Sequence, residues 1–500
     1  MTANLIELST LGAYLLVLLW IGIRAARQVK TSADYTLSGR DVPWVIVLAT
    51  TAATMIGGGA SVGMVSRVAE VGIAAALVTC AWHLQLIFTG LFVAPKLRGL
   101  NLITVGDYFH LKFGPLAREM AVVNCVIFLI GALAAQMAAI GTVTYAVLGI
   151  PYEWALLIGA TVTVFYSTVG GIRAVIKTDV MQFTILVVGI GIASALLLEN
   201  NGGFTGLLEA TSSQQFTVNS HWSTTRIVSL FFAFLLGETF VPPYTVRCFV
   251  ARDARDARRG VAGAGIFLLL FLPIATFALG TSALASPEVH QAIVENQRSL
   301  VDAAAAKGEI LSEVEATQQS YQLVFPTLVR TTFHPAFAGI MIAAIMAAVM
   351  SSADSCLSCL STVVMEDTYR RHINPSANDQ QLLRVAQGST LLMGIAAALC
   401  ALFFHDIADI LEFVYDFWAP TMVLPFMVAV FCYRESRIYA VVASMLAGLI
   451  AVVVWRFVLG SPYEIGPALF GFGVAIVAYV VALPLTSRLP VMRLFQPGNE

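Results

Sequence analysis

Four small or oxygen-bearing side chains share one helix face inside an apolar stretch, residues 343–369. They are Ala348, Ser351, Ser352 and Ser355, and they are spaced i, i+3, i+4 and i+7. Hydroxyl and carbonyl oxygens are the ligands that a hard cation such as sodium would use. Small residues also let two membrane helices pack closely, with each hydroxyl bonded to the carbonyl one turn back. The face therefore predicts either an ion site or close helix packing.

The elements that carry this face are membrane helices. The chain has 500 residues, of which 58% are hydrophobic and 12% charged, and its mean hydropathy is +0.83. In soluble proteins about a quarter of the residues are charged. The first apolar run continues into Arg24 and Arg27 without a cleavage site, which indicates a retained span. We therefore expect an all-α, multi-pass protein of the cell (plasma) membrane, whose partner is the lipid bilayer.

Several other classes of function are disfavoured. The net charge of −2 argues against a nucleic-acid partner. No nucleophile–base pair is evident, so we do not expect an enzyme. Cys356 and Cys359 form a single CxxC motif with no second motif nearby, so we do not expect a zinc site. Nothing in the sequence indicates an obligate protein partner.

Apolar runs of about 20 residues predict thirteen spans. They are residues 5–24, 42–66, 72–95, 118–148, 152–170, 176–198, 223–246, 260–285, 335–366, 382–403, 407–432, 438–458 and 463–486. Most of the 28 lysines and arginines fall in alternate loops, which predicts an outside N-terminus and a cytoplasmic C-terminus. The segments 199–222 and 286–334 are then outside, and the second is expected to form surface helices. Arg247 falls in a cytoplasmic segment, and no arginine is expected in the middle of the membrane.

Two of these spans carry helix-breaking residues. Three glycines, Gly57–Gly59, interrupt the second span, and the pair Pro242 and Pro243 interrupts the seventh. Either break alone could be a simple kink. Together they open two groups of five spans, and because five is odd the second group is inverted. Paired interrupted helices at matching positions of two halves indicate a transporter with a site at the membrane midplane.

The chain is thus expected to form one transmembrane transporter domain, residues 1–500. Its parts are an extra first helix (5–24), a first repeat (42–198), a second repeat (223–432) and two additional helices (438–486).

Three motifs resemble the sodium/solute symporter family. YSTVGGIRAVIKTDVMQ (166–182) resembles the fifth-helix signature of that family, and VRCFVARDARDARRG (246–260) resembles the loop after its broken sixth helix. AAVMSSADSCLSCLSTVVMEDTYRR (347–371) resembles its eighth core helix. The similarity covers essentially the whole chain, and TMIGGG and AAVMSSADS are most similar to the high-affinity choline transporter branch. The resemblance implies a leucine-transporter-like inverted repeat and sodium-coupled symport of a small organic solute by alternating access.

The resemblance also implies a sodium site between the first and eighth core helices, with sodium as the co-transported ion. Carried over by position, its ligands are the backbone carbonyls of Ala52, Met55 and Ala348 and the hydroxyls of Ser351 and Ser352.

A second ion site is possible at Asp179, Asp354 and Ser355. In some relatives an aspartate that matches Asp179 joins serines of the eighth core helix, but Asp354 stands where those relatives have a serine. Asp354 could strengthen ion binding or take up a proton. Asp179 could instead be a solvent-exposed residue at a helix start, where the helix dipole favours it.

Polar and aromatic residues of the cavity-forming helices are candidate solute contacts, although each could also be a packing hydrogen bond. The candidates are Thr54, Gly58, Trp82, Gln85, Gln136, Glu238, Tyr244, Glu412 and Tyr415. Trp82 is the one large aromatic residue at the places where the choline branch surrounds its substrate with rings, so choline is disfavoured. With no mid-membrane arginine, a solute carboxylate would need the amides of residues 57–60. We favour an amino acid, an amine or a monocarboxylate over a sugar.

Two other functions remain open. One is a solute-sensing membrane receptor, although the chain has no kinase domain. The other is proton-coupled symport through Asp354, Asp179 or Glu238.

Overall fold

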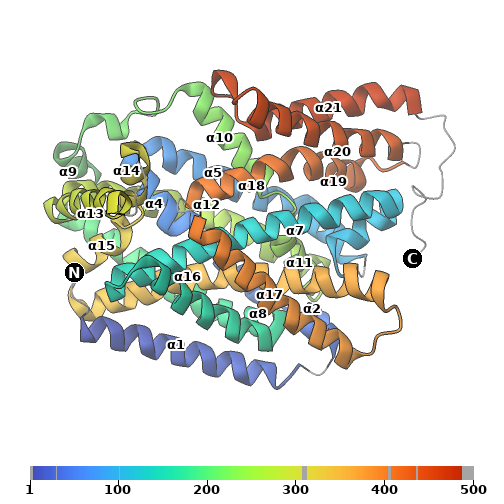
Figure 1. The fold of residues 1–500 in the computed structure, drawn as a ribbon, viewed down its shortest axis with the longest axis horizontal. Helices are drawn as coiled ribbons and strands as arrows, with labels where there is room; N and C mark the ends of the chain where they lie inside the picture. Colours follow the sequence, from blue (N-terminus) through green and yellow to red (C-terminus); the bar gives the residue numbers. More distant parts are fainter. Residues whose placement is uncertain are drawn as a thin grey trace.

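The computed structural model describes residues 4–29, 31–100, 102–306, 312–403, 407–434 and 437–486, and these residues form a bundle of long helices (Figure 1). The α-helices are α1 (Leu5–Ala26), α2 (Ser32–Leu37), α3 (Trp44–Met55), α4 (Met64–Val71), α5 (Ile73–Phe88), α6 (Ala94–Arg98), α7 (Val105–Leu148), α8 (Tyr152–Asn200), α9 (Gly203–Ala210), α10 (Thr224–Gly237), α11 (Pro242–Val250), α12 (Ala254–Ala285), α13 (Pro287–Ala306), α14 (Glu313–Tyr321), α15 (Val324–Thr332), α16 (Pro335–Thr362), α17 (Asp379–Phe403), α18 (Ile407–Trp418), α19 (Leu424–Phe431), α20 (Ile438–Val453) and α21 (Pro467–Thr486). Short π-helical segments are η2 (Gly59–Gly63), η3 (Thr89–Val93), η5 (Val363–Ile373), η6 (Ala419–Val423) and η8 (Val454–Val458).

Twelve of the thirteen predicted spans meet the length and composition of a membrane span. Ten helices of the described residues do so alone, and two bent helix pairs do so when each pair is one span. The predicted span 152–170 is not among these twelve, but it is the first part of α8. A kink at Gly171, where φ is +53°, separates it from the second part. Glycine is needed there, because a Cβ atom would lie 2.6 Å from the ring of Tyr35.

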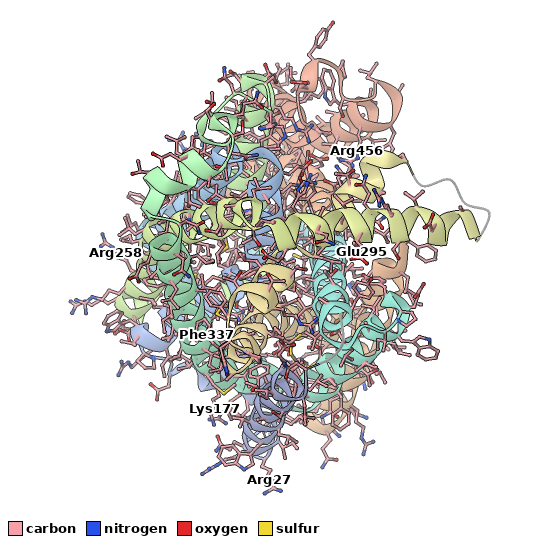
Figure 2. The ribbon with its side chains drawn as sticks, turned by 90° about the vertical axis from the view of Figure 1, so that its left-hand side faces the viewer. Arg27, Lys177, Arg258, Glu295, Phe337 and Arg456 are labelled. Carbon is pink, nitrogen blue, oxygen red and sulfur yellow. The ribbon has the colours of Figure 1, made fainter. Side chains whose placement is uncertain are left out.

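The segments that the sequence predicts to be outside lie together at one end of the bundle. α1 begins at this end, and α9, α13 and α15 lie there too (Figure 1). Figure 2 views this end directly, with α13 and its Glu295 lying across the ends of the spans. α21 ends at the opposite end, as expected for an odd number of spans. Which end faces the cytoplasm stays a prediction of the positive-inside rule.

Both predicted helix breaks are confirmed. α3 and α4 meet at 58°, and the interruption lies at the glycine run Gly57–Gly59. α10 and α11 meet at 41°, and Pro242 and Pro243 form the first turn of α11. Proline is tolerated at that position because the first amide groups of a helix have no partner inside the helix. The break positions therefore follow from local backbone chemistry.

The serine-bearing helix α16 lies at the centre of the bundle. It packs against α8, α7 and α1, and 83% of its most apolar window is buried, against 28% for α1 and 17% for α21. Ser351, Ser352 and Ser355 are all buried. The polar face of this helix therefore contacts protein on every side, and α1 and α21 contribute the lipid-facing surface.

Candidate ion and solute site

The serine face of α16 contacts the carboxyl end of α3. The Ser351 hydroxyl donates hydrogen bonds to the carbonyl oxygens of Ala53 (2.9 Å) and Ala348 (2.8 Å). The Ser352 hydroxyl donates to the carbonyl oxygen of Thr54 at 2.5 Å. The last carbonyls of a helix lack partners within that helix and lie at the negative end of its dipole. Two hydroxyl and three carbonyl oxygens thus form one uncharged cluster, which we call the oxygen cluster.

The other two predicted sodium ligands flank the oxygen cluster. Ala52 and Met55 are the residues on either side of Ala53 and Thr54, at the end of α3. The Ala52 carbonyl accepts a hydrogen bond from the amide of Ile56 at 3.0 Å. The side chains of Ala52 and Met55 are buried. The structure thus places Ala348, Ser351 and Ser352 at the contact between α3 and α16, where the two serines bond the carbonyls of Ala53 and Thr54 and not those of the predicted Ala52 and Met55.

The glycines after α3 allow three helices to approach this contact. A Cβ atom on Gly57 would lie 2.3 Å from the Ser352 hydroxyl oxygen on α16. A Cβ atom on Gly58 would lie 2.5 Å from Ala139 on α7, and one on Gly59 would lie 2.4 Å from Leu411 on α18. Any larger residue would push these helices away from the end of α3.

A buried arginine lies beside the oxygen cluster, which corrects the sequence prediction. Arg247 was expected in a cytoplasmic loop, with no arginine inside the membrane. It is instead fully buried in α11 and pairs with the carboxylate of Asp179 at 3.1 Å. Its guanidinium also donates to the Thr54 hydroxyl (2.7 Å), the Ser355 hydroxyl (2.5 Å) and the Pro243 carbonyl (2.9 Å).

Asp179 is therefore not an exposed residue at a helix start. It lies within the second part of α8, its side chain has no exposed surface, and the Thr50 hydroxyl donates to the same oxygen that contacts Arg247. The sequence held one signal for this arrangement. α11 resumes directly after its two prolines, and Arg247 lies four residues after Pro243, which is still inside the helix.

Asp354 lies on another side of α16. The hydroxyls of Tyr166 and Ser167, from the first part of α8, both donate to its carboxylate, at 2.5 Å for Ser167. Asp179 and Ser355 are both bonded to Arg247, whereas neither forms a hydrogen bond with Asp354 among the described contacts. The three residues of the possible second ion site are thus divided between two separate polar clusters. Tyr166 and Ser167 were not among the predicted site residues, although they belong to the motif 166–182.

A small cavity adjoins the oxygen cluster. Its volume is about 40 Å³, which is room for only a few water molecules. The described residues that line it are Thr54, Met55, Gly57, Gly59, Ala60, Trp82, Phe128, Ala132, Gln136, Glu238, Val241, Pro243, Tyr244, Ser352, Cys356, Leu411 and Tyr415. Thr54, Met55 and Ser352 belong to both the cavity and the contact between α3 and α16, so the two places are continuous.

Six of the nine predicted solute contacts line this cavity, and Gly58 lies beside it. The six are Thr54, Trp82, Gln136, Glu238, Tyr244 and Tyr415. The Gly58 amide donates to the Gln136 side-chain oxygen at 2.7 Å, the Tyr415 hydroxyl donates to Glu238 at 2.5 Å, and the Tyr244 hydroxyl donates to the sulfur of Met55 at 2.7 Å. Gln85 does not line the cavity. It is buried in α5, where it accepts a hydrogen bond from Thr89 at 3.4 Å.

Glu412 also lies outside this cavity. It lines a second hollow, the outer pocket, together with Arg67 and Asp409, which form an ion pair at 2.7 Å. Phe234 lines the outer pocket and stacks on Trp82, which lines the cavity, with ring centres 4.6 Å apart. This stacked pair therefore separates the cavity from the outer pocket.

Known proteins are similar to this chain over most of its length. The model of the sodium:solute symporter family matches residues 35–448. The chain is 26% identical over 486 residues to the sodium/proline symporter of Escherichia coli K12, which covers 94% of this chain and 92% of that protein. It is 23% identical over 485 residues to the high-affinity choline transporter 1 of Caenorhabditis elegans, covering 94% and 80% of the two chains. A solved structure of a Na⁺-coupled sialic acid symporter superposes with a TM-score of 0.79 at 21% identity, covering 96% of this chain and 98% of the other.

The fold is the all-helical, leucine-transporter-like fold of such symporter structures. The chain belongs to the sodium:solute symporter family. It is a multi-pass plasma-membrane protein that couples sodium to the transport of small solutes, and it is not an enzyme.

Proposed function

We propose that sodium binds at the contact between α3 and α16 and that the solute binds in the adjoining cavity. The observation that carries the proposal is that the same residues belong to both places. Thr54, Met55 and Ser352 line the cavity, and the Ser352 hydroxyl bonds the Thr54 carbonyl. An ion there would draw on uncharged oxygens alone, including the predicted carbonyls of Ala52 and Met55. Such a site suits a monovalent ion that must leave again.

Ion binding at this contact provides a route to coupling. Sodium would hold the end of α3 against α16 and favour an outward-open state, because the ion has a higher affinity for the state in which both helices contribute ligands. Solute binding then permits closure. After inward opening, low cytoplasmic sodium favours release of the ion, which frees α3 from α16. The membrane potential adds about 2.3 kcal/mol per charge per 100 mV.

We propose that the Arg247 guanidinium, and not a second sodium ion, neutralises Asp179. Arg247 supplies a positive charge to Asp179 at 3.1 Å, and it also bonds Ser355. A sodium ion at the same carboxylate would meet that positive charge at short range, which is unfavourable in a buried site. One sodium ion per transport cycle is therefore the proposed stoichiometry.

The proposed solute is a small amino acid, amine or monocarboxylate rather than a sugar. The cavity is small, and several of its polar lining groups are already hydrogen-bonded within the protein: Gln136 to Gly58, Glu238 to Tyr415 and Tyr244 to Met55. At the level of the subgroup, the motifs TMIGGG and AAVMSSADS support similarity to the choline branch. Residues 42–198 and 223–432 are the proposed inverted repeats.

A sodium titration of the purified protein tests the ion site. Tryptophan fluorescence reports binding, since Trp82 lines the adjoining cavity. We expect a saturable response to sodium, absent with potassium, and a shift to at least about tenfold higher sodium in the Ser351→Ala/Ser352→Ala variant, because two of the ligands are lost. Ser361→Ala is the matched control, since Ser361 lies on the same helix and its hydrogen bonds, to the Ser358 carbonyl and to Tyr35, lie outside the oxygen cluster. An unchanged sodium response in the double variant would reject the site.

A further inference from the structure

We propose that the transported solute is a cation, a small organic ammonium ion held between the Glu238 carboxylate and surrounding aromatic rings. This inference rests on the proposed function, since it names the solute class of the same cavity. It narrows the choice among amino acid, amine and monocarboxylate to one.

The first observation is the charge of the cavity wall. Glu238 is the one acidic side chain among the described residues that line it, and no lysine, arginine or histidine is among them. Arg247 lies behind Thr54 and is paired with Asp179, so its charge is already balanced. A carboxylate inside a membrane protein is costly unless a cation accompanies it. An anionic solute would instead place a second negative charge beside Glu238.

The second observation is the position of Glu238 on its helix. It is the capping residue directly after the last residue of α10, and the carboxyl end of a helix carries the negative end of the helix dipole. A carboxylate at that end opposes the dipole, so the local helix chemistry does not explain it. The Tyr415 hydroxyl donates to one carboxylate oxygen at 2.5 Å and holds the group at the cavity wall. Both the side chain and the helix end therefore favour a cation.

The third observation is the set of aromatic side chains that line the same cavity as the carboxylate. Trp82, Phe128, Tyr244 and Tyr415 line the cavity from four different helices. Trp82 stacks on Phe234. The ring centres of Phe128 and Tyr415 are 6.3 Å apart, and their ring planes meet at 23°. An organic cation within about 6 Å of such ring faces is attracted by their electron density. Rings also supply apolar contact for the carbon atoms of an alkylammonium ion.

A zwitterionic amino acid fits this wall less well than an amine. Its ammonium group could meet Glu238, but its carboxylate would need donors. The amides of residues 57–60 were the predicted donors, and one of these four, that of Gly58, already donates to Gln136 at 2.7 Å. A zwitterion should therefore bind more weakly than a cation of the same size, because its anionic end has fewer free donors and shares the cavity with the Glu238 carboxylate.

Four probes of equal ring size and different charge test the solute class. Cyclopentylamine is a cation, L-proline a zwitterion, cyclopentanecarboxylate an anion and cyclopentanol neutral. Binding of each is measured by tryptophan fluorescence of the full-length purified protein in saturating sodium. We expect cyclopentylamine to bind at least about tenfold more tightly than the anion and the alcohol, with L-proline between them. Equal or tighter binding of the anion or the alcohol, or no binding of the amine, would overturn the proposal.

The Glu238→Gln variant tests the carboxylate itself. Glutamine removes the charge and keeps the shape of the side chain and one oxygen that can accept the Tyr415 hydrogen bond. We expect it to weaken amine binding at least about tenfold and to change cyclopentanol binding much less, because the alcohol carries no charge. Glu199→Gln, at the exposed end of α8, is the matched control. Amine binding equal to that of the wild type in Glu238→Gln would also overturn the proposal, and the wild-type probe series decides alone if the variant does not fold.

The sodium titration in the same samples separates this inference from the function beneath it. A sodium response that depends on Ser351 and Ser352, together with no preference for the amine, would reject the cationic solute and leave the ion site standing. A sodium response that ignores both serines would reject the ion site, while the order of the four probes would still decide the charge of the solute.

Discussion

Replacing both members of the buried ion pair between Arg247 and Asp179 should cost clearly less than the sum of the two single replacements. Neither side chain has any exposed surface, and the guanidinium nitrogen lies 3.1 Å from the carboxylate oxygen. The guanidinium also bonds Thr54, Ser355 and the Pro243 carbonyl. These bonds connect α11 with α3, α8 and α16, which are the helices around the oxygen cluster.

The magnitude follows from leaving one charge buried without its partner. Arg247→Met leaves the Asp179 carboxylate unpaired, and Asp179→Asn leaves the guanidinium unpaired, so each single variant should lose about 3–5 kcal/mol of unfolding free energy. The double variant buries neither charge. Its loss should therefore fall short of the sum of the two single losses by at least about 2 kcal/mol.

A double-mutant cycle measures this difference. Unfolding free energies come from denaturation with sodium dodecyl sulfate in mixed micelles. The Arg370–Glu366 pair, joined at 3.2 Å one helix turn apart with the arginine about half exposed, is the matched control. The cycle Arg370→Met and Glu366→Gln should give a coupling below about 1 kcal/mol. Additive losses at Arg247 and Asp179 would refute the view that this pair is a buried, mutually dependent unit.

Two further predictions concern Gly57, which contacts Ser352 of the oxygen cluster, and Asp354, which lies on another side of α16. Gly57→Ala should abolish the sodium response and cost about 1–3 kcal/mol of stability, because the added Cβ atom would lie 2.3 Å from the Ser352 hydroxyl oxygen. Gly473→Ala on α21 is the control, since its Cβ atom meets nothing within 4 Å, and equal effects of the two variants in a sodium titration and a thermal melt would contradict the prediction. Asp354→Asn should keep sodium-driven uptake, since asparagine still accepts a hydrogen bond from Tyr166, whereas Asp354→Ala should lose about 1–3 kcal/mol in the same melt because buried hydroxyls lose their acceptor. Loss of all uptake in Asp354→Asn, together with uptake driven by a pH gradient in sodium-free buffer, would indicate proton coupling instead.

Features set by local chemistry were predictable from the sequence. Helix breaks at Gly57–Gly59 and at Pro242 and Pro243 lie where glycine and proline disfavour a helix, and the bends of 58° and 41° occur there. The face shared by Ser351 and Ser352 follows from the helical repeat. Its contact with a second polar element was expected because a row of hydroxyls does not suit lipid.

Features that depend on depth along a helix were not predictable in the same way. Glu412 lies three residues before Tyr415, which is about 4.5 Å along the helix axis, and this shift moves it from the cavity to the outer pocket. Gln85 lies three residues after Trp82, and the same shift along the helix axis leaves it outside the cavity lining. A sequence pattern gives the face of a residue but not its depth relative to another helix.

Arg247 shows a second limit. Counting basic residues in loops depends on where each span ends, and a helix that resumes after two prolines carries its charged residue into the interior. Asp179, whose negative charge offsets the cost of burying Arg247, is 68 residues away in the sequence. No local pattern joins the two, so only the packed structure reveals the pair.

Equilibrium binding of radioactive sodium to the purified protein tests the ion site most directly. The oxygen cluster of α3 and α16, with Asp179 already paired to Arg247, predicts one saturable sodium ion per chain. That binding should be lost in Ser351→Ala/Ser352→Ala and kept in Ser361→Ala. Two sodium ions per chain, or full binding in the double variant, would contradict the proposed site.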